Sequence, residues 1–332
     1  MSDENTLLFI SESDTVALLN WPDVIACLAA AYAAPDEPAA VPPRVVARKG
    51  AAWLRVLSAL SPSGRHMGVK IIARARKPQS SYLIPLWDQD SAELVCLLDG
   101  KHVTALRTAG TTAVAVDRIL PKGGVRVAVL GAGLEARSHA CALATVREFK
   151  SLTVYSPTPA SREKFAREFA RELKIECRAT DAARAAVESA DLIIAAARSR
   201  DETPILEGAW LKSGMMVVSI GSTLPEQREV DAEVVRRAEW IVADVPREVT
   251  HETGDMLAAQ KAGVAFEQKI VSLADLVQGR RAVRQTAGNI ILFKSVGSAL
   301  QDIAVSELCL EKARALGIGT RLPMALSVKG KQ

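Results

Sequence analysis

Short apolar runs alternate with amphipathic segments through the second half of the chain. The apolar runs lie at 125–130, 151–155, 191–197, 215–220, 240–243 and 270–273, and segments 162–173 and 231–238 carry apolar residues at helical spacing. Strands with so few polar positions are typical of a parallel sheet that is buried on both faces. The alternation therefore predicts an α/β fold with a doubly wound, Rossmann-type parallel sheet.

The pattern in the first part of the chain is different. Residues 13–34 show helical spacing, interrupted near Trp21-Pro22, and candidate strands lie at 53–60, 67–73, 81–87 and 94–98. Short strands separated by Pro, Gly and Asp predict an antiparallel or mixed sheet. Residues 290–316 are predicted as one long helix that returns to this first domain. Because 332 residues exceed the usual size of a single core, we expect two domains: a discontinuous α+β domain of residues 1–117 and 298–332, and a Rossmann-type domain of residues 118–297.

A dinucleotide-binding fingerprint, Gly131-Ala-Gly133-Leu-Glu-Ala136, follows the run at 125–130 directly. Gly131 permits the tight turn, and Gly133 lets the backbone approach a pyrophosphate without a Cβ in the way. Ala136 allows the following helix to pack closely on the strand. The N–H groups near Leu134 and Glu135 at the start of that helix attract phosphates. The spacing therefore predicts a bound NAD(P) cofactor.

The end of the second strand indicates which nucleotide is bound. A site selective for NAD normally has an acidic residue there that binds the ribose hydroxyls, but residues 156–162 include no acid. The hydroxyl groups of Ser156, Thr158 and Ser161 and the guanidinium group of Arg162 suit the 2′-phosphate of NADP. The alternative is an ordinary polar loop, so NADP is the expected cofactor and NAD the second choice.

Charge and cysteine usage argue against several classes of protein. The formal net charge is +4, and Lys and Arg are dispersed apart from short clusters such as Arg280-Arg281, so we expect no nucleic-acid partner. The five cysteines are far apart and the four histidines show no ligand spacing, which predicts no metal site and a reducing compartment. The sequence has no signal-peptide pattern and no apolar run of membrane-spanning length. Together these features predict a soluble, cytoplasmic protein without a membrane partner.

Three basic residues of the first domain stand in apolar or turn contexts. They are Arg44 after Pro42-Pro43, Lys70 within the apolar run 67–72, and Arg107. Burial of the Lys70 ammonium group without a partner would be costly, and a bound anion would offset that cost. Each of the three, taken alone, is also compatible with a surface or strand-edge charge.

Seen with other motifs, these residues resemble the ornithine cyclodeaminase/mu-crystallin family, in order from about Arg44 to the C-terminal helix. The matching pieces are Pro43-Arg44, Gly68-Val-Lys70, Leu98-Asp-Gly100, Thr104-Ala-Leu-Arg107-Thr108-Ala, Gly131-Ala-Gly133, Ile220-Gly221-Ser222, Arg228-Glu229-Val230-Asp231, Glu252-Thr-Gly254-Asp255, Phe293-Lys294-Ser295-Val-Gly297 and Asp302.

The resemblance implies a homodimer whose first domain forms the interface, with a cleft between the domains. It implies that Arg44, Lys70 and Arg107 bind the carboxylate of a small amino or imino acid, since a bidentate arginine and a second cation would orient its Cα toward the nicotinamide. It also places at the cofactor a further set of residues, Thr108, Ser219, Gly221 and Lys294.

One position departs from the cyclodeaminases of this family, which have an aspartate in the loop after the fifth strand for loss of ammonia and ring closure. The aligned residue here is Thr223, in Gly221-Ser222-Thr223-Leu224-Pro225. A hydroxyl group cannot act as a carboxylate base near neutral pH. The chain is therefore more similar to the mu-crystallin-like ketimine reductases.

The resulting hypothesis is an NAD(P)H-dependent reductase of α-imino acids, an oxidoreductase acting on C=N bonds, or a related amino-acid dehydrogenase. Lys70 is the candidate proton donor, although binding of the carboxylate alone is an equally good role for it. Asp302 would orient Lys70 or a water molecule, or else is a helix-surface acid. The alternatives are a cyclodeaminase-type lyase that recycles NAD, and a non-catalytic protein that binds NADPH and a small carboxylate.

Overall fold

The chain divides into two compact units. The computed structural model describes residues 7–76, 79–199, 201–323, 326 and 328. One unit comprises residues 1–107 and 298–332, and the other comprises residues 108–297. The division falls inside helix α3 (Gly100–Ile119), whereas the sequence analysis placed the boundary after residue 117. Each unit is described by itself below.

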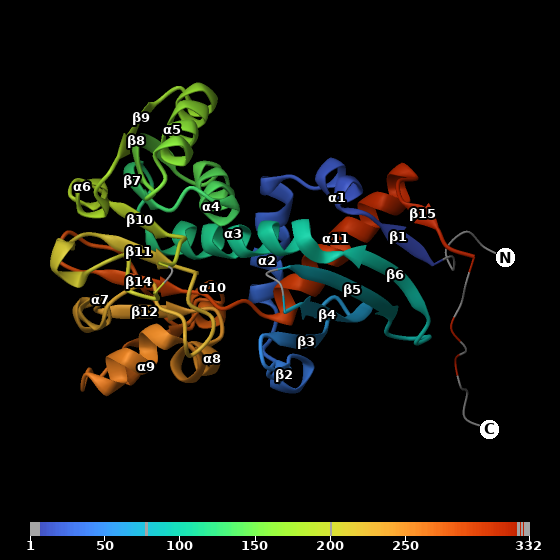
Figure 1. The fold of residues 1–332 in the computed structure, drawn as a ribbon. Helices are drawn as coiled ribbons and strands as arrows, with labels where there is room; N and C mark the ends of the chain where they lie inside the picture. The colour runs from blue at the N-terminus through green and yellow to red at the C-terminus, as the bar shows by residue number, and fades with distance from the viewer. Residues whose placement is uncertain (1–6, 77–78, 200, 324–325, 327, 329–332) are drawn as a thin grey trace. The chain divides into compact units, whose positions relative to one another are not determined.

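The unit of residues 108–297 is built on a parallel sheet. Within the described residues this sheet has eight strands, and every pairing between them is parallel. Their order is β9 (Glu176–Thr180), β8 (Glu148–Tyr155), β7 (Gly124–Leu130), β10 (Leu192–Ala195), β11 (Met216–Ser219), β14 (Ile291–Lys294), β12 (Trp240–Ala243) and β13 (Ile270–Ser272). In Figure 1 the labels from β9 to β12 follow this order. The predicted doubly wound sheet is confirmed, and its chain order reverses between β7 and β10, where such folds bind ligands at the carboxyl ends of the strands.

Helices cover this sheet because its strands are apolar on both faces. The helices are α4 (Leu134–Ala144), α5 (Pro159–Leu173), α6 (Ala183–Val187), α7 (Ala232–Arg237), α8 (Pro246–Glu252), α9 (Gly254–Lys261) and α10 (Leu273–Val277), with short 3-10 turns η3 (Gly208–Trp210) and η4 (Glu267–Lys269). One core cluster joins alternate strand residues such as Ala128, Ile193 and Val217 to apolar residues of α6, α7 and α9. Side-chain caps mark the starts of α7 and α10, where the Asp231 carboxylate accepts the Val234 N–H and the Ser272 Oγ accepts the Ala274 N–H.

The prediction of one helix over residues 290–316 is wrong. Residues Ile291–Lys294 form β14, a central strand between β11 and β12, and helix α11 (Ala299–Leu316) begins only after a break. Gly297 in that break has φ +79°, a conformation that favours glycine and interrupts a helix. A four-residue apolar run fits a strand and a helix equally well, so only the neighbouring strands decide its conformation. The polar edge strand β9 was missed because its residues show no apolar pattern.

The other unit contains a mixed sheet. Among the described residues its strand order is β15 (Thr320–Arg321), β1 (Leu8–Ile10), β6 (Leu94–Asp99), β5 (Ser80–Asp88), β4 (His66–Arg74), β3 (Ala52–Leu60) and β2 (Val45–Lys49). β1 pairs with β6 in parallel, and the other neighbours pair antiparallel. The predicted strands at 53–60, 67–73, 81–87 and 94–98 correspond to β3, β4, β5 and β6.

Helices α1 (Glu12–Leu18), α2 (Trp21–Ala33) and α11 complete this unit, together with a 3-10 turn η2 (Pro38–Ala40). The predicted interruption near Trp21-Pro22 is where α2 starts, with the Asn20 side chain accepting the Asp23 N–H. Helix α11 packs against α1, α2 and strands β3 to β5, and Figure 1 shows it beside the sheet. Among the described helices, none by itself has the length and apolar character to cross a membrane; α1 and α2 meet these criteria only as a pair, which is bent by 91°.

Arg147 holds the C-terminal end of α3 within the unit of residues 108–297. Its Nη2 donates to the carbonyl oxygens of Val116, Asp117 and Leu120 at 3.2, 3.0 and 2.5 Å, and its Nη1 donates to the Asp117 carboxylate at 2.5 Å. The last carbonyl groups of a helix lack partners within it, so the buried guanidinium supplies a charged donor where the helix ends. The Val116 carbonyl oxygen also accepts the Leu120 N–H at 2.9 Å.

We predict that Arg147→Met lowers the free energy of unfolding by about 2–4 kcal/mol, because several buried carbonyl groups lose a charged donor at once. Urea unfolding followed by circular dichroism measures the change. Arg167→Met, at an exposed position of α5, is the matched control and should shift the free energy by less than about 0.5 kcal/mol. Equal effects of the two substitutions would contradict the assignment.

Candidate active site

Lys70 and Asp302 form a buried ion pair in the unit that contains α11. The Lys70 Nζ lies 2.7 Å from both carboxylate oxygens of Asp302, and the two side chains are 1% and 0% exposed. Lys70 comes from the middle of β4 and Asp302 from the first turn of α11. The alternation along β4 turns His66, Gly68 and Lys70 to the buried side. Asp302 is therefore a buried partner of Lys70 and not a helix-surface acid.

Gly68 permits this close packing. A Cβ at Gly68 would lie 2.6 Å from the Ile303 Cδ1 and 2.7 Å from a Leu86 methyl group, which is closer than carbon atoms can pack. The Pro85 carbonyl oxygen of β5 would lie 2.9 Å from the same Cβ, so a side chain at this position would displace the Ile303 and Leu86 side chains and crowd the backbone of β5.

Burial lowers the pKa of Lys70 to about 7, and the nearby positive charges of Arg107 and Arg55 act in the same direction. The Asp302 carboxylate opposes both effects, because it favours the charged ammonium form. Lys70 can therefore gain or lose a proton near neutral pH, unlike an ordinary lysine.

Arg107, near the start of α3, is bound to the same carboxylate. Its Nε donates to the Asp302 Oδ1 at 2.9 Å, and its Nη1 donates to the Gln301 Oε1 at 2.9 Å. The Gln301 Nε2 in turn donates to the Tyr32 hydroxyl group of α2 at 2.7 Å. The structure therefore brings Lys70, Arg107 and Asp302 together, as the resemblance implied for the two cations.

Sequence reasoning missed Gln301, Tyr32 and Arg55. Arg55 is a buried residue of β3, where it lies over the Trp53 ring at 5.1 Å, and its charge reaches Lys70. Its inward position in an alternating strand was the available signal. The predicted Arg44 lies immediately before β2 and is half-buried; in the sheet, β3 separates β2 from β4.

The glycine-rich turn of the other unit is shaped for a phosphate group. Gly131 has φ +123°, and a Cβ there would lie 2.8 Å from the Ala196 carbonyl oxygen. A Cβ at Gly133 would meet no atom within 4 Å, so the space beside the start of α4 is open. Gly133 caps α4 without a side-chain hydrogen bond, which leaves the first N–H groups, near Leu134 and Glu135, available to an anion. The open space at Gly133 and the first N–H groups of α4 fit the pyrophosphate of a dinucleotide.

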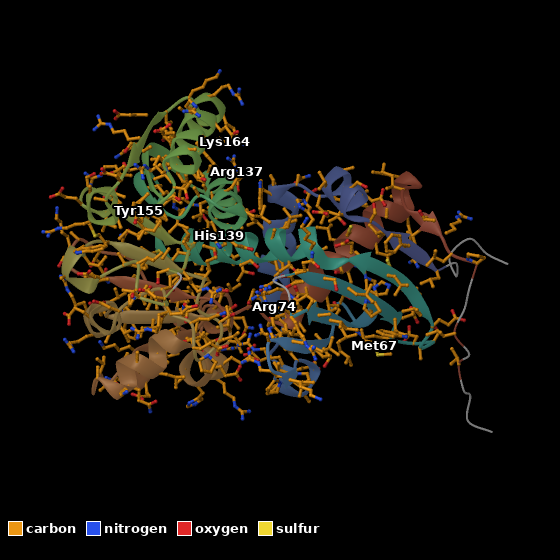
Figure 2. The ribbon with its side chains drawn as sticks, in the orientation of Figure 1. Met67, Arg74, Arg137, His139, Tyr155 and Lys164 are labelled. Atoms are coloured by element: carbon orange, nitrogen blue, oxygen red, sulfur yellow. The ribbon has the colours of Figure 1, made fainter. Side chains whose placement is uncertain are left out.

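The end of β8 lies beside this turn. The Gly131 N–H donates to the Tyr155 carbonyl oxygen at 2.8 Å, and Figure 2 labels Tyr155 on β8 and Arg137 and His139 on α4. After Tyr155, the Arg162 Nη1 donates to the Ser156 carbonyl oxygen at 2.9 Å. Thr158 caps α5 without a side-chain hydrogen bond. Ser156, Thr158 and Arg162 are thus grouped beside the glycine-rich turn, as the sequence analysis expected.

Ser219, Gly221 and Lys294 meet at the carboxyl ends of β11 and β14. The Lys294 Nζ donates to the Ser219 Oγ and to the Asp255 Oδ2, both at 2.8 Å. The Ser219 Oγ and the Gly221 N–H donate to the Glu229 Oε2 at 2.6 and 2.9 Å. Ser219 and Lys294 are fully buried in this network, whereas Gly221 is half-buried. Thr108, also predicted at the cofactor, is a half-buried residue of α3.

Thr223 lies in the loop that follows β11 and Gly221. Its N–H and its Oγ1 lie 2.9 and 3.3 Å from the Gln227 Oε1. The same loop packs on the start of α9, where a Cβ at Gly254 would lie 2.1 Å from the Gln227 carbonyl oxygen.

Within the part of the chain that the structure describes, no group of three or more His, Cys, Asp or Glu side chains could hold a metal ion, and the five cysteines are free thiols.

Comparison with known proteins identifies the family of the chain. The profile of the Ornithine cyclodeaminase/mu-crystallin family matches residues 10–316. Ketimine reductase mu-crystallin of Mus musculus is 28% identical over 295 residues, which cover 86% of this chain and 90% of that protein.

Two solved structures have the same fold along nearly the whole chain. The Thermococcus litoralis Δ1-pyrroline-2-carboxylate reductase, solved with NADH and L-proline, has a TM-score of 0.87 at 29% identity, covering 95% of this chain and 100% of that one. A probable ornithine cyclodeaminase from Bordetella pertussis has a TM-score of 0.83 at 27% identity, covering 94% and 99%. The chain belongs to the ornithine cyclodeaminase/mu-crystallin family.

Proposed function

We propose that this protein is an NAD(P)H-dependent reductase of α-imino acids. The observation that carries the proposal is the buried Lys70–Asp302–Arg107 cluster, in which two cations share one carboxylate. A cluster with an excess of buried positive charge favours a bound anion. Similarity to a ketimine reductase and to a pyrroline-2-carboxylate reductase supports an imino carboxylate as that anion.

Arg44, Lys70 and Arg107 are the proposed residues for the substrate carboxylate. The Arg107 guanidinium group is planar and is held on one side by Asp302 and Gln301, so its remaining N–H groups have a fixed direction. Such preorganisation lowers the entropic cost of binding a carboxylate in one orientation. Gln301 and Tyr32 act by holding Arg107 in place.

Lys70 is the proposed proton donor to the imine nitrogen, with Asp302 as the residue that orients its ammonium group. Imine reduction requires a proton and a hydride. Because the pKa of Lys70 is lowered to about 7, its ammonium form is a stronger acid than an ordinary lysine and is present below neutral pH. Binding of the carboxylate without proton transfer is the alternative role for Lys70.

The proposed cofactor site consists of Gly131, Gly133 and the start of α4 for the pyrophosphate, with Ser156, Thr158 and Arg162 for the 2′-phosphate of NADP. The nicotinamide supplies the hydride when the cofactor is bound. The predicted cofactor residues also include Thr108, Ser219, Gly221 and Lys294. The side chains of Ser219 and Lys294 are buried, so we propose that they position the turn at Gly221 and do not contact the cofactor themselves.

A homodimer is part of the proposal. In the unit of residues 1–107 and 298–332, apolar side chains of β2, β3 and β5 are exposed, among them Val45 at 69% and Leu54 at 43%. An exposed apolar strand surface of this kind is typical of a protein interface. The free thiols are compatible with the expected cytoplasmic compartment, which stays a prediction.

The proposal predicts NAD(P)H oxidation with a cyclic imine carboxylate and no release of ammonia from ornithine. Thr223 stands where a cyclodeaminase has its aspartate, and a general base is typically worth ~10²–10⁴ in rate, so lyase activity should lie near the detection limit. Absorbance at the NAD(P)H maximum and an ammonia assay measure the two reactions. Ammonia release from ornithine would establish the lyase instead, and cofactor binding without either reaction would establish the non-catalytic protein.

Arg107→Leu should raise the KM for the imino acid and lower kcat. The loss of a charge-assisted, oriented contact costs about 2–4 kcal/mol in kcat/KM. Steady-state kinetics measures the change, and Arg65→Leu, at an exposed position of the same unit, is the matched control. Unchanged kinetics in a folded Arg107→Leu protein would remove Arg107 from the substrate site.

NADPH should bind more tightly than NADH, and Arg162→Ala should reduce that preference roughly tenfold because one charged donor to the 2′-phosphate is lost. Fluorescence titration gives both dissociation constants. Arg171→Ala, at an exposed position near the other end of α5, should leave the preference unchanged. Equal affinities for NADPH and NADH in the unmutated protein would refute the assignment.

A further inference from the structure

Glu229 is a fully buried carboxyl group to which the reaction assigns no role. Its Oε2 accepts two hydrogen bonds, from the Ser219 Oγ at 2.6 Å and from the Gly221 N–H at 2.9 Å. Its Oε1 is also buried and accepts no hydrogen bond from any described residue. The two oxygens of this carboxyl group therefore have different environments.

This asymmetry allows Glu229 to take up a proton without breaking the network. Oε2 accepts both hydrogen bonds whether the group is ionised or carries a proton on Oε1. Gly221 approaches the other oxygen so closely that a Cβ there would lie 2.4 Å from Oε1. The charge of Glu229 can thus change while the turn at Gly221 keeps its hydrogen bond.

Burial raises the pKa of Glu229 to about 7, and the negative charge of Asp255 acts in the same direction. The positive charge of Lys294 and the hydrogen bonds from Ser219 and Gly221 act in the opposite direction. Further charged groups of this region are Arg228, 3.5 Å from Asp255, and Glu202, which accepts the Arg228 N–H and pairs with Arg198. Protonation of Oε1 removes one unit of negative charge from this region and needs no change in these contacts.

The Glu229 carboxyl group lies next to the carboxyl ends of β11 and β14, through its contacts with Ser219 and Gly221. Nucleotides bind outside the carboxyl ends of the strands in doubly wound sheets. The oxidised nicotinamide ring carries one positive charge more than the reduced ring. An ionised Glu229 stabilises a cationic ring at this edge, and a neutral Glu229 does not.

We propose that Glu229 sets the relative affinity of the protein for oxidised and reduced pyridine nucleotide through the charge of its buried carboxyl group. The inference rests on the proposed function in one respect, namely that a pyridine nucleotide is the cofactor. Below about pH 7 the group is increasingly protonated, so the oxidised nucleotide binds more weakly while the reduced nucleotide is less affected. By linkage, binding of the oxidised nucleotide lowers the proton affinity of Glu229 and releases protons. In a reductase, a neutral Glu229 therefore favours release of the oxidised product.

The test is a comparison of dissociation constants for NADP⁺ and NADPH, without substrate, at about pH 6 and about pH 8. We expect the ratio of Kd for NADP⁺ to Kd for NADPH to rise roughly threefold to tenfold at the lower pH, as one partly screened charge is lost. In Glu229→Gln the ratio should be high at both pH values. This variant is nearly isosteric, and its amide oxygen can still accept from Ser219 and Gly221.

Two control variants separate this effect from others. Glu239→Gln removes the same charge from an exposed position before β12, at the amino ends of the strands, and should keep the pH dependence of the unmutated protein. Lys70 titrates in the same pH range, so Lys70→Met should also keep it. Proton release on NADP⁺ binding to the unmutated protein, measured in weakly buffered solution, gives a result that needs no variant.

A Kd ratio that is independent of pH in the unmutated protein would overturn the inference, as would a Glu229→Gln protein with the same pH dependence as the unmutated one. Either result leaves the proposed reductase intact, because imino-acid-dependent NAD(P)H oxidation is measured separately. If the Kd ratio of Lys70→Met no longer depended on pH, the pH dependence would be assigned to Lys70 and not to Glu229. A protein that binds neither nucleotide would overturn both proposals.

Discussion

The need to pair a buried lysine organises the unit that contains α11. A lysine in the middle of a buried strand is unfavourable without a counterion, and β4 contains no acidic residue. Asp302 supplies the counterion from a helix more than two hundred residues later in the chain, at 2.7 Å. The pair is therefore one reason why residues 298–316 belong with the first part of the chain. Gly68, two positions before Lys70, leaves room for the Ile303 side chain of α11.

Lys70 and Glu229 belong to two buried charge networks of different composition. Around Asp302, the cations Lys70 and Arg107 share a single carboxylate, with Arg55 adding positive charge nearby. Around Lys294, the carboxylates Asp255 and Glu229 lie near a single ammonium group. Burial shifts the two pKa values in opposite directions, downward for Lys70 and upward for Glu229, to about 7 in both cases. Each of these two networks thus holds a buried group whose charge can change near neutral pH.

The parallel sheet explains why residues distant in sequence form the second network. In a sheet whose strands all run in one direction, every strand ends at the same edge. Ser219 ends β11 and Lys294 ends β14, and these strands are neighbours although seventy-five positions separate the two residues. The loops that follow, with Gly221, Thr223 and Glu229, then reach the start of α9 at Asp255.

The sequence by itself determined the doubly wound sheet, the glycine-rich turn and its neighbouring hydroxyl groups, because each depends on local periodicity or on residues a few positions apart. It also predicted Lys70, Arg107 and Asp302 as site residues through the family resemblance, and the structure brings these three side chains together. Only the tertiary structure decided that residues 291–294 form a central strand, since a short apolar run takes its conformation from its neighbours. Likewise, only the fold revealed Arg55, Gln301 and the lone oxygen of Glu229, because burial and the contacts that shift a pKa arise between residues far apart in the chain.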